Sequence, residues 1–94
     1  MKEFEDTMIP LGSMVELKSG NKTMIIGFGL EDNKKKQRYD YLGCDPVYGF
    51  IGNFILFDSE DVKKVLFNGY TNEPLINLYN KKVKEELEKW KMKN

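Results

Sequence analysis

Acidic side chains form the densest group of residues that could do chemistry in this chain. Asp58, Glu60 and Asp61 lie almost side by side, and paired carboxylates can act as acid and base or bind calcium. Acidic groups also suit the start of a helix, where they interact favourably with unpaired N–H groups. A calcium loop of the EF-hand type would need alternating oxygen ligands and a closing glutamate, and the segment lacks that pattern. We therefore interpret the cluster as a helix start.

The other common routes to catalysis are missing from the sequence. It contains no histidine, which removes the commonest general base, Cys/His nucleophile pairs and the usual zinc sites. The single cysteine, Cys44, has no neighbouring basic group to activate its thiol, so we expect an inert side chain near a turn. Gly27 and Gly29 lack the third glycine and the following helix of a nucleotide-binding loop. The sequence predicts a non-enzymatic protein with no cofactor and no metal.

The balance of charges bears on the kind of partner. Lysine and arginine together number 15, as do aspartate and glutamate, giving a formal net charge of +0. Proteins dedicated to nucleic acids or to anionic membranes normally carry a basic excess. The basic run at 34–38 follows Glu31 and Asp32, so we interpret it as a solvated loop. These features favour a protein partner over a nucleic acid or a membrane.

Features of the chain as a whole predict a cytoplasmic protein. The sequence has no run of about eighteen apolar residues that could span a membrane. Residues 1–6 are acidic and polar, unlike the apolar stretch of a signal peptide. One cysteine cannot form an intrachain disulfide, which fits a reducing compartment.

Hydrophobic periodicity predicts the elements that must position these residues. Apolar and polar residues alternate over 14–18, and a turn containing Gly20 and Asn21 leads into an apolar segment over 23–28, which is typical of a hairpin. Polar residues 29–37 are expected to form a loop. Further strands are predicted over residues 38–43, 50–57 and 66–70, with a short helical turn from Asp58 before the last strand.

A long amphipathic helix is predicted to close the chain. Pro74 suits its first position, and apolar residues then recur at spacings of three or four. They are Ile76, Tyr79, Val83, Leu87 and Trp90. The predicted fold is α+β: a small, strongly bent antiparallel sheet or barrel of about five strands, with the helix over one face. We expect one domain, 1–94, with a polar lead-in (1–9), a β body (10–72) and the helix (73–93).

Aromatic residues near the predicted strand ends and turns are the candidates for binding a partner. They are Tyr39, Tyr41, Tyr48, Phe50 and Tyr70, together with Trp90 at the far end of the helix. Tyrosine combines a large rigid area with a polar tip, which protein interfaces favour. The competing interpretation is that these side chains complete a small core. The position of Trp90 also leaves a homodimer open.

Several short motifs occur in an order that resembles a known family. Pro10–Ser13 precedes the first strand, and Met24–Gly27 and Tyr39–Gly43 follow. Val47–Gly49, then Asp61–Val62 with Val65–Tyr70, complete the series. Over about residues 9 to 72, the chain resembles small Gram-positive proteins of domain of unknown function 4176, typically encoded beside LXG-type toxins in type VII secretion loci.

The resemblance implies a cytoplasmic chaperone or targeting adaptor for a secreted toxin, and it implies no catalytic residues. The family commonly has a basic residue where this chain has Phe28, so no charged role is transferred to that position.

The leading expectation is therefore a protein-binding accessory whose partner is a secreted toxin or its small helper protein. An immunity-type inhibitor is a second class, and it would bind the toxin's catalytic domain and protect cells. A small-ligand or nucleic-acid-binding barrel is a third, marked by stacking aromatics and, for nucleic acid, a steep salt dependence. An enzyme would need a deep pocket holding two carboxylates with separated pKa values.

Overall fold

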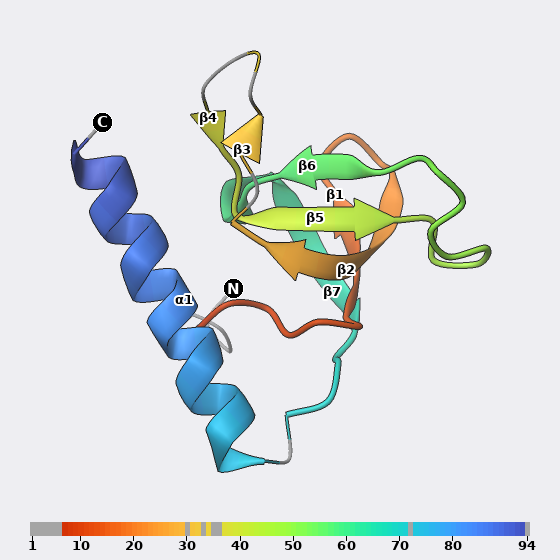
Figure 1. Ribbon diagram of the computed structural model, residues 1–94. Coiled ribbons are helices and arrows are strands. Elements are labelled where there is room, and N and C mark those ends of the chain that lie inside the picture. Colours follow the sequence, from red (N-terminus) through yellow and green to blue (C-terminus); the bar gives the residue numbers. More distant parts are fainter. Residues whose placement is uncertain (1–6, 30, 33, 35–36, 72, 94) are drawn as a thin grey trace.

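Figure 1 shows the computed structural model, which describes residues 7–29, 31–32, 34, 37–71 and 73–93. Five strands form one antiparallel sheet in the order β6-β5-β2-β1-β7, and a single long helix lies to one side of it. The strands are β1 (Met14–Leu17), β2 (Lys22–Phe28), β5 (Tyr41–Cys44), β6 (Ile55–Phe57) and β7 (Val62–Phe67), and the helix is α1 (Pro74–Lys93). The predicted α+β fold is confirmed.

The predicted hairpin is formed by β1 and β2. Val15 and Leu17 point into the core and are buried, whereas the intervening Glu16 is half-buried on the other face. Val15 lies opposite Thr23, which is also buried. The turn between the strands contains Gly20 with a φ of 96°, a conformation that glycine adopts without steric penalty.

Two of the predicted strands lie elsewhere than expected. Residues 50–54 are not part of a strand, and β6 covers only the end of the segment predicted over 50–57. The last strand begins at Val62 instead of at Leu66, because Val62 pairs with Leu17 and the strand continues along β1. The segment predicted as a helical turn is a single 3-10 turn, Ser59–Asp61, directly before β7.

The segment predicted as a loop over 29–37 contains a small ladder of its own. The two-residue strands β3 (Glu31–Asp32) and β4 (Gln37–Arg38) pair in antiparallel fashion. The Arg38 guanidinium lies 5.3 Å from the centre of the Trp90 ring, a cation–π geometry. This contact places the ladder beside the C-terminal half of α1 (Figure 1). Positions 35 and 36 of the basic run lie outside the described residues.

Tyr41 occupies the centre of the core. Its side chain is 1% exposed, its ring stacks on Phe57 with centroids 5.3 Å apart, and the edge contact with Phe28 is at 5.9 Å. Its hydroxyl accepts a hydrogen bond of 2.9 Å from the Ile9 backbone N–H. Burial raises the pKa of the Tyr41 hydroxyl. The tyrosine therefore fixes the N-terminal segment against the sheet.

The N-terminal segment in turn meets the helix. A polar lead-in was predicted over 1–9, but Met8 and Ile9 are buried, and positions 1–6 lie outside the described residues. The Met8 N–H donates a 3.4 Å hydrogen bond to the Asn80 carbonyl. Asn80, which is not part of the predicted apolar stripe, is buried, whereas Tyr79 of that stripe is 56% exposed.

A cluster of charges ties the other end of α1 to the sheet. The Lys91 Nζ lies 2.7 Å from Asp40 Oδ1 and 3.4 Å from Asp58 Oδ1. Asp58 Oδ1 also accepts the Asp40 N–H at 3.0 Å, and Asp40 Oδ2 accepts the Ser59 N–H at 2.9 Å. Partial desolvation lowers the pKa of Lys91, but the carboxylates of Asp40 and Asp58 outweigh it and raise that pKa overall.

Substitution of Lys91 by methionine is expected to lower the free energy of unfolding by about 0.5–1 kcal/mol, since the pair is partly exposed and solvent screens it. Because the folded-state pKa of Lys91 is raised, its stabilisation is complete below the usual value of 10.5 and is lost as the pH rises through the folded value. Urea unfolding of both proteins at several pH values measures the difference.

Lys89→Met is the matched control, because the Lys89–Glu86 pair is an exposed contact within the helix. We expect this change to alter stability by less than about 0.5 kcal/mol. An equal loss in the two variants would contradict the assigned role of Lys91.

Candidate functional site

The six aromatic residues predicted to bind a partner lie in different surroundings. Tyr48 and Phe50 are on the segment between β5 and β6 and are 75% and 60% exposed. Tyr70, in the connection between β7 and α1, is also exposed. Tyr41 belongs to the core, so the prediction is wrong for that residue: its ring and hydroxyl are already occupied by internal contacts.

The other two aromatic residues are half-buried. Tyr39 precedes β5, and its hydroxyl lies 3.5 Å from the Gln37 side-chain oxygen. Trp90 has Arg38 over its ring. Both are therefore engaged by residues of β4. Of the six residues, only Tyr48 and Phe50 share one exposed loop.

The segment 45–54, here called the β5–β6 loop, has an ordered tip held by one carboxylate. Asp45 Oδ1 accepts the N–H groups of Val47 at 2.8 Å and Tyr48 at 2.9 Å. The Gly49 N–H donates to the Asp45 carbonyl at 2.9 Å, and Gly49 has a φ of 76°. The N–H groups of Tyr48 and Val47 lower the pKa of Asp45. This turn sets the direction of the loop before any partner arrives.

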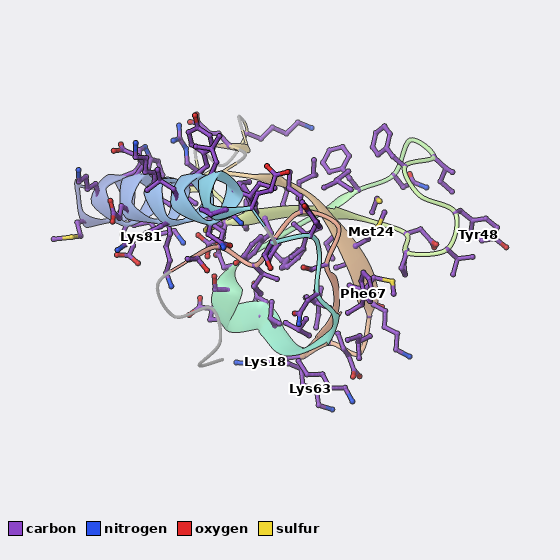
Figure 2. The ribbon with its side chains drawn as sticks, turned by 90° about the horizontal axis from the view of Figure 1, so that it is seen from below. Lys18, Met24, Tyr48, Lys63, Phe67 and Lys81 are labelled. Atoms are coloured by element: carbon purple, nitrogen blue, oxygen red, sulfur yellow. The ribbon has the colours of Figure 1, made fainter. Side chains whose placement is uncertain are left out.

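In this turn and beyond it, the β5–β6 loop presents large apolar side chains to solvent. They are Val47, Tyr48, Phe50, Ile51 and Phe54, each between 57% and 81% exposed. The rings of Phe50 and Phe54 stack at 6.5 Å. The loop projects away from the sheet, and Tyr48 lies at the opposite end of the molecule from Lys81 of the helix (Figures 1 and 2). Apolar groups gathered on one exposed segment typically mark an interaction site.

Sequence reasoning identified Tyr48 and Phe50 but missed Val47, Ile51 and Phe54. The apolar content of 50–57 predicted a strand, in which alternate side chains would be buried. A signal in the sequence could have corrected this, because Gly49 and Gly52 are only three residues apart. Both have positive φ values, 76° and 97°, which interrupt an extended strand.

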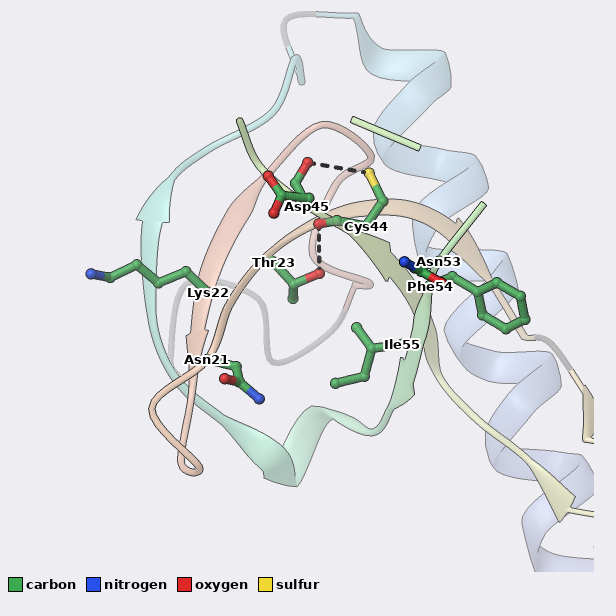
Figure 3. Close-up of a pocket in the computed structure, with 8 residues that line it drawn as sticks. All are labelled: Asn21, Lys22, Thr23, Cys44, Asp45, Asn53, Phe54 and Ile55. Atoms are coloured by element: carbon green, nitrogen blue, oxygen red, sulfur yellow. Dashed lines mark hydrogen bonds between the residues drawn. The ribbon is translucent and has the colours of Figure 1, made fainter. Parts of the chain in front are cut away.

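A cavity of about 240 Å³ lies between the β5–β6 loop and the turn of the first hairpin (Figure 3). It is lined by Asn21, Lys22, Thr23, Cys44, Asp45, Asn53, Phe54 and Ile55. Thr23 Oγ1 donates to the Cys44 carbonyl at 2.9 Å, and Cys44 Sγ lies 3.7 Å from the Asp45 carbonyl. The cavity is smaller than typical pockets for drug-sized ligands, which measure about 300–1,000 Å³. Its size suits a single side chain of a partner.

Two of the three carboxylates singled out in the sequence, Asp58 and Asp61, are used by the fold. Asp58 binds Lys91 and the Asp40 N–H, and Asp61 accepts the Asp58 N–H at 2.9 Å. Within the described part of the chain, no group of three or more histidine, cysteine, aspartate or glutamate residues is arranged to hold a metal ion. The 3-10 turn that these acidic residues form agrees with their interpretation as a helix start.

A second apolar area lies on the outer face of α1. Leu75, Leu78 and Tyr79 occupy neighbouring positions on the helix surface and are exposed. None of these three residues lines the cavity beside the β5–β6 loop or the one beside Met8 and Lys91. It is therefore the weaker candidate for a defined site.

The fold and the exposed loop define a small α+β protein with a bent antiparallel sheet and an apolar contact surface at one end. Residues 8–78 match a domain of unknown function (DUF4176), and the chain belongs to that family. The matched region includes the whole five-stranded sheet, the β5–β6 loop and the start of α1. Comparisons with curated proteins and with solved structures gave no match. None of the helices among the described residues is both long and apolar enough to cross a membrane.

Replacement of Asp45 by alanine is expected to loosen the tip of the β5–β6 loop, because the N–H groups of Val47 and Tyr48 lose their acceptor. Hydrogen exchange followed by NMR should show faster exchange at these two amides, with the amides of β2 unchanged.

The same loosening is expected in the unmodified protein at low pH. Because the folded-state pKa of Asp45 is lowered, its contribution is present above the usual value of 3.8 and is lost as the pH falls through the folded value. Asp45→Asn retains an acceptor and serves as the control. Unchanged exchange in Asp45→Ala would show that the carboxylate does not organise the tip.

Proposed function

We propose that this protein is a non-enzymatic accessory that binds another protein through the β5–β6 loop. The observation that carries the proposal is the exposure of five large apolar side chains on one loop with an ordered tip. Tyrosine and phenylalanine are favoured in the centres of protein interfaces. Full burial of one such side chain contributes roughly 1.5–3 kcal/mol.

The ordered backbone of the loop supports this role as much as its apolar composition does. A segment that must be fixed upon binding loses conformational entropy at that step, and pre-organisation reduces the loss. Here, Asp45 already holds the backbone at Val47 and Tyr48. The side chains beyond the turn can therefore meet a partner without prior folding of the tip.

The biological setting is proposed from the family resemblance. This chain resembles accessory proteins encoded beside LXG-type toxins in type VII secretion loci of Gram-positive bacteria. We propose a cytoplasmic chaperone or targeting adaptor, whose partner is the secreted toxin or its small helper protein. A toxin held before export would cover the apolar loop, which otherwise favours nonspecific association.

Two observations disfavour a small-ligand or nucleic-acid-binding barrel. The cavity beside the loop measures about 240 Å³, below the usual range for ligand sites. The formal net charge of the chain is +0, whereas nucleic-acid binding normally relies on a basic excess.

Co-purification from the native host tests the proposal. We expect tagged protein to retain an LXG-type protein or its small helper in stoichiometric amounts. The double variant Tyr48→Ser/Phe50→Ser should lose most of this partner, because both side chains are exposed and contribute nothing to the core. The retained amount is measured by quantitative mass spectrometry.

Met92→Ser provides a matched control, since Met92 is an apolar residue of α1 that is 87% exposed. It should leave the capture unchanged. Equal capture by the wild type and the loop variant would overturn the proposed contact. Protection of cells from the partner's toxicity, without any effect on its export, would favour an immunity-type inhibitor over an adaptor.

A further inference from the structure

The outer face of the sheet continues the apolar surface of the β5–β6 loop. Met14 of β1 lies directly opposite Met24 of β2 on one side and Phe67 of β7 on the other. Residues that are paired in this way share one face of a sheet. Val15, which follows Met14, points into the core, so this row faces outward. Met14 and Met24 are half-buried and Phe67 is 58% exposed.

A row of charges runs beside this apolar row. Glu16 lies opposite Lys22 on β2 and Lys64 on β7. The Lys64 Nζ is 3.7 Å from Glu16 Oε1, and the lysine side chain is 61% exposed whereas that of the glutamate is 19% exposed. One partly covered carboxylate therefore stands between two exposed ammonium groups. The row therefore presents a net positive charge to solvent.

The two rows are continuous with the loop. Met24 pairs with Cys44, the residue immediately before the β5–β6 loop. Lys22 lines the same cavity as Phe54 from the other end of that loop. Figure 2 shows Tyr48, Met24 and Phe67 together at the end of the molecule away from Lys81. The β5–β6 loop, the apolar row and the lysines of the charged row therefore lie next to one another.

We infer that the segment of the partner that binds here is an acidic amphipathic helix. Its apolar side chains would cover the row of Met14, Met24 and Phe67, and its carboxylates would face Lys22 and Lys64. From Met24 to Phe67 the row spans two strand spacings, or about 10 Å, which is close to the diameter of a helix. This inference rests on the proposed function and specifies the chemistry of the partner.

An extended strand added to the edge of the sheet fits the structure less well. The sheet has two edge strands. One, β6, is only three residues long, and very short edge strands discourage pairing. The other, β7, pairs with β1 through two irregularities in register and carries Lys63 and Lys64. Bulges and lysines are features that discourage the addition of a further strand at a sheet edge. A helix laid across the outer face makes its own backbone hydrogen bonds and does not depend on that edge.

A second copy of this chain is also a poor fit as the occupant. Its only long helix among the described residues is α1, in which lysines outnumber glutamates. Such a helix would place like charges against Lys22 and Lys64. An acidic helix from a different protein provides the complementary charge.

Three labelled synthetic helices test the inference. They share a leucine face and differ in a polar face of glutamate, glutamine or lysine, and binding to the intact protein is followed by fluorescence anisotropy. We expect the glutamate peptide to bind at least about tenfold more tightly than the lysine peptide, from two exposed charge contacts. The difference should shrink in about 1 M salt. Equal affinities, or no binding by any peptide, would overturn the inference.

The double variant Lys22→Glu/Lys64→Glu should reverse the preference among the peptides. The double variant Lys22→Gln/Lys64→Gln should abolish the preference. Because it adds no charge repulsion with Glu16, it replaces the first variant if that one fails to fold. Lys81→Glu/Lys82→Glu on α1 is the control, with exposed lysines outside this face, and should leave the preference intact. If the control variant also reversed the preference among the peptides, the preference would not depend on Lys22 and Lys64.

The same variants separate this inference from the proposed function. If loop variants lose the native partner but the two lysine variants retain it fully, protein binding through the loop stands and the acidic helix is wrong. If neither set alters capture, both are wrong.

Discussion

The hydrogen bond between the Tyr41 hydroxyl and the Ile9 N–H, 2.9 Å long and buried, connects the parts of this fold. Tyr41 stands on β5 among the core aromatics, and the N-terminal segment that it fixes reaches α1 through the Met8 N–H and the Asn80 carbonyl. Loss of the hydroxyl would leave a buried N–H unpaired, which costs about 1–3 kcal/mol. This buried polar contact therefore joins the sheet to the N-terminal segment, which in turn meets the helix.

This arrangement separates the aromatic residues by role. Tyr41, Phe28 and Phe57 fill the interior, so the core does not require the aromatic residues of the β5–β6 loop. Asp45 uses its carboxylate to order the tip of that loop and leaves the apolar side chains exposed. An exposed apolar surface is unfavourable in water, and its burial by another protein recovers that free energy. This gain in free energy is the physical basis of the proposed binding through the loop.

Local patterns in the sequence predicted the first hairpin and α1, because alternation and helical spacing are properties of neighbouring residues. They misplaced β7, whose extent follows from its pairing with β1, and they missed the burial of Met8, which needs contacts with distant segments. The sequence placed Tyr41 in a predicted strand and Tyr48 outside one, but it did not show that Tyr41 is buried and Tyr48 exposed. The candidate site was therefore predicted only in part.

The central claim is that the β5–β6 loop, and not α1, is the contact with the partner. Hydrogen–deuterium exchange of the purified complex with its native partner, compared with the free protein, tests it most directly. We predict that binding slows exchange in residues 50–54 and leaves the turn that carries Leu75, Leu78 and Tyr79 unchanged. Slower exchange on that part of α1, with the loop unaffected, would contradict the account.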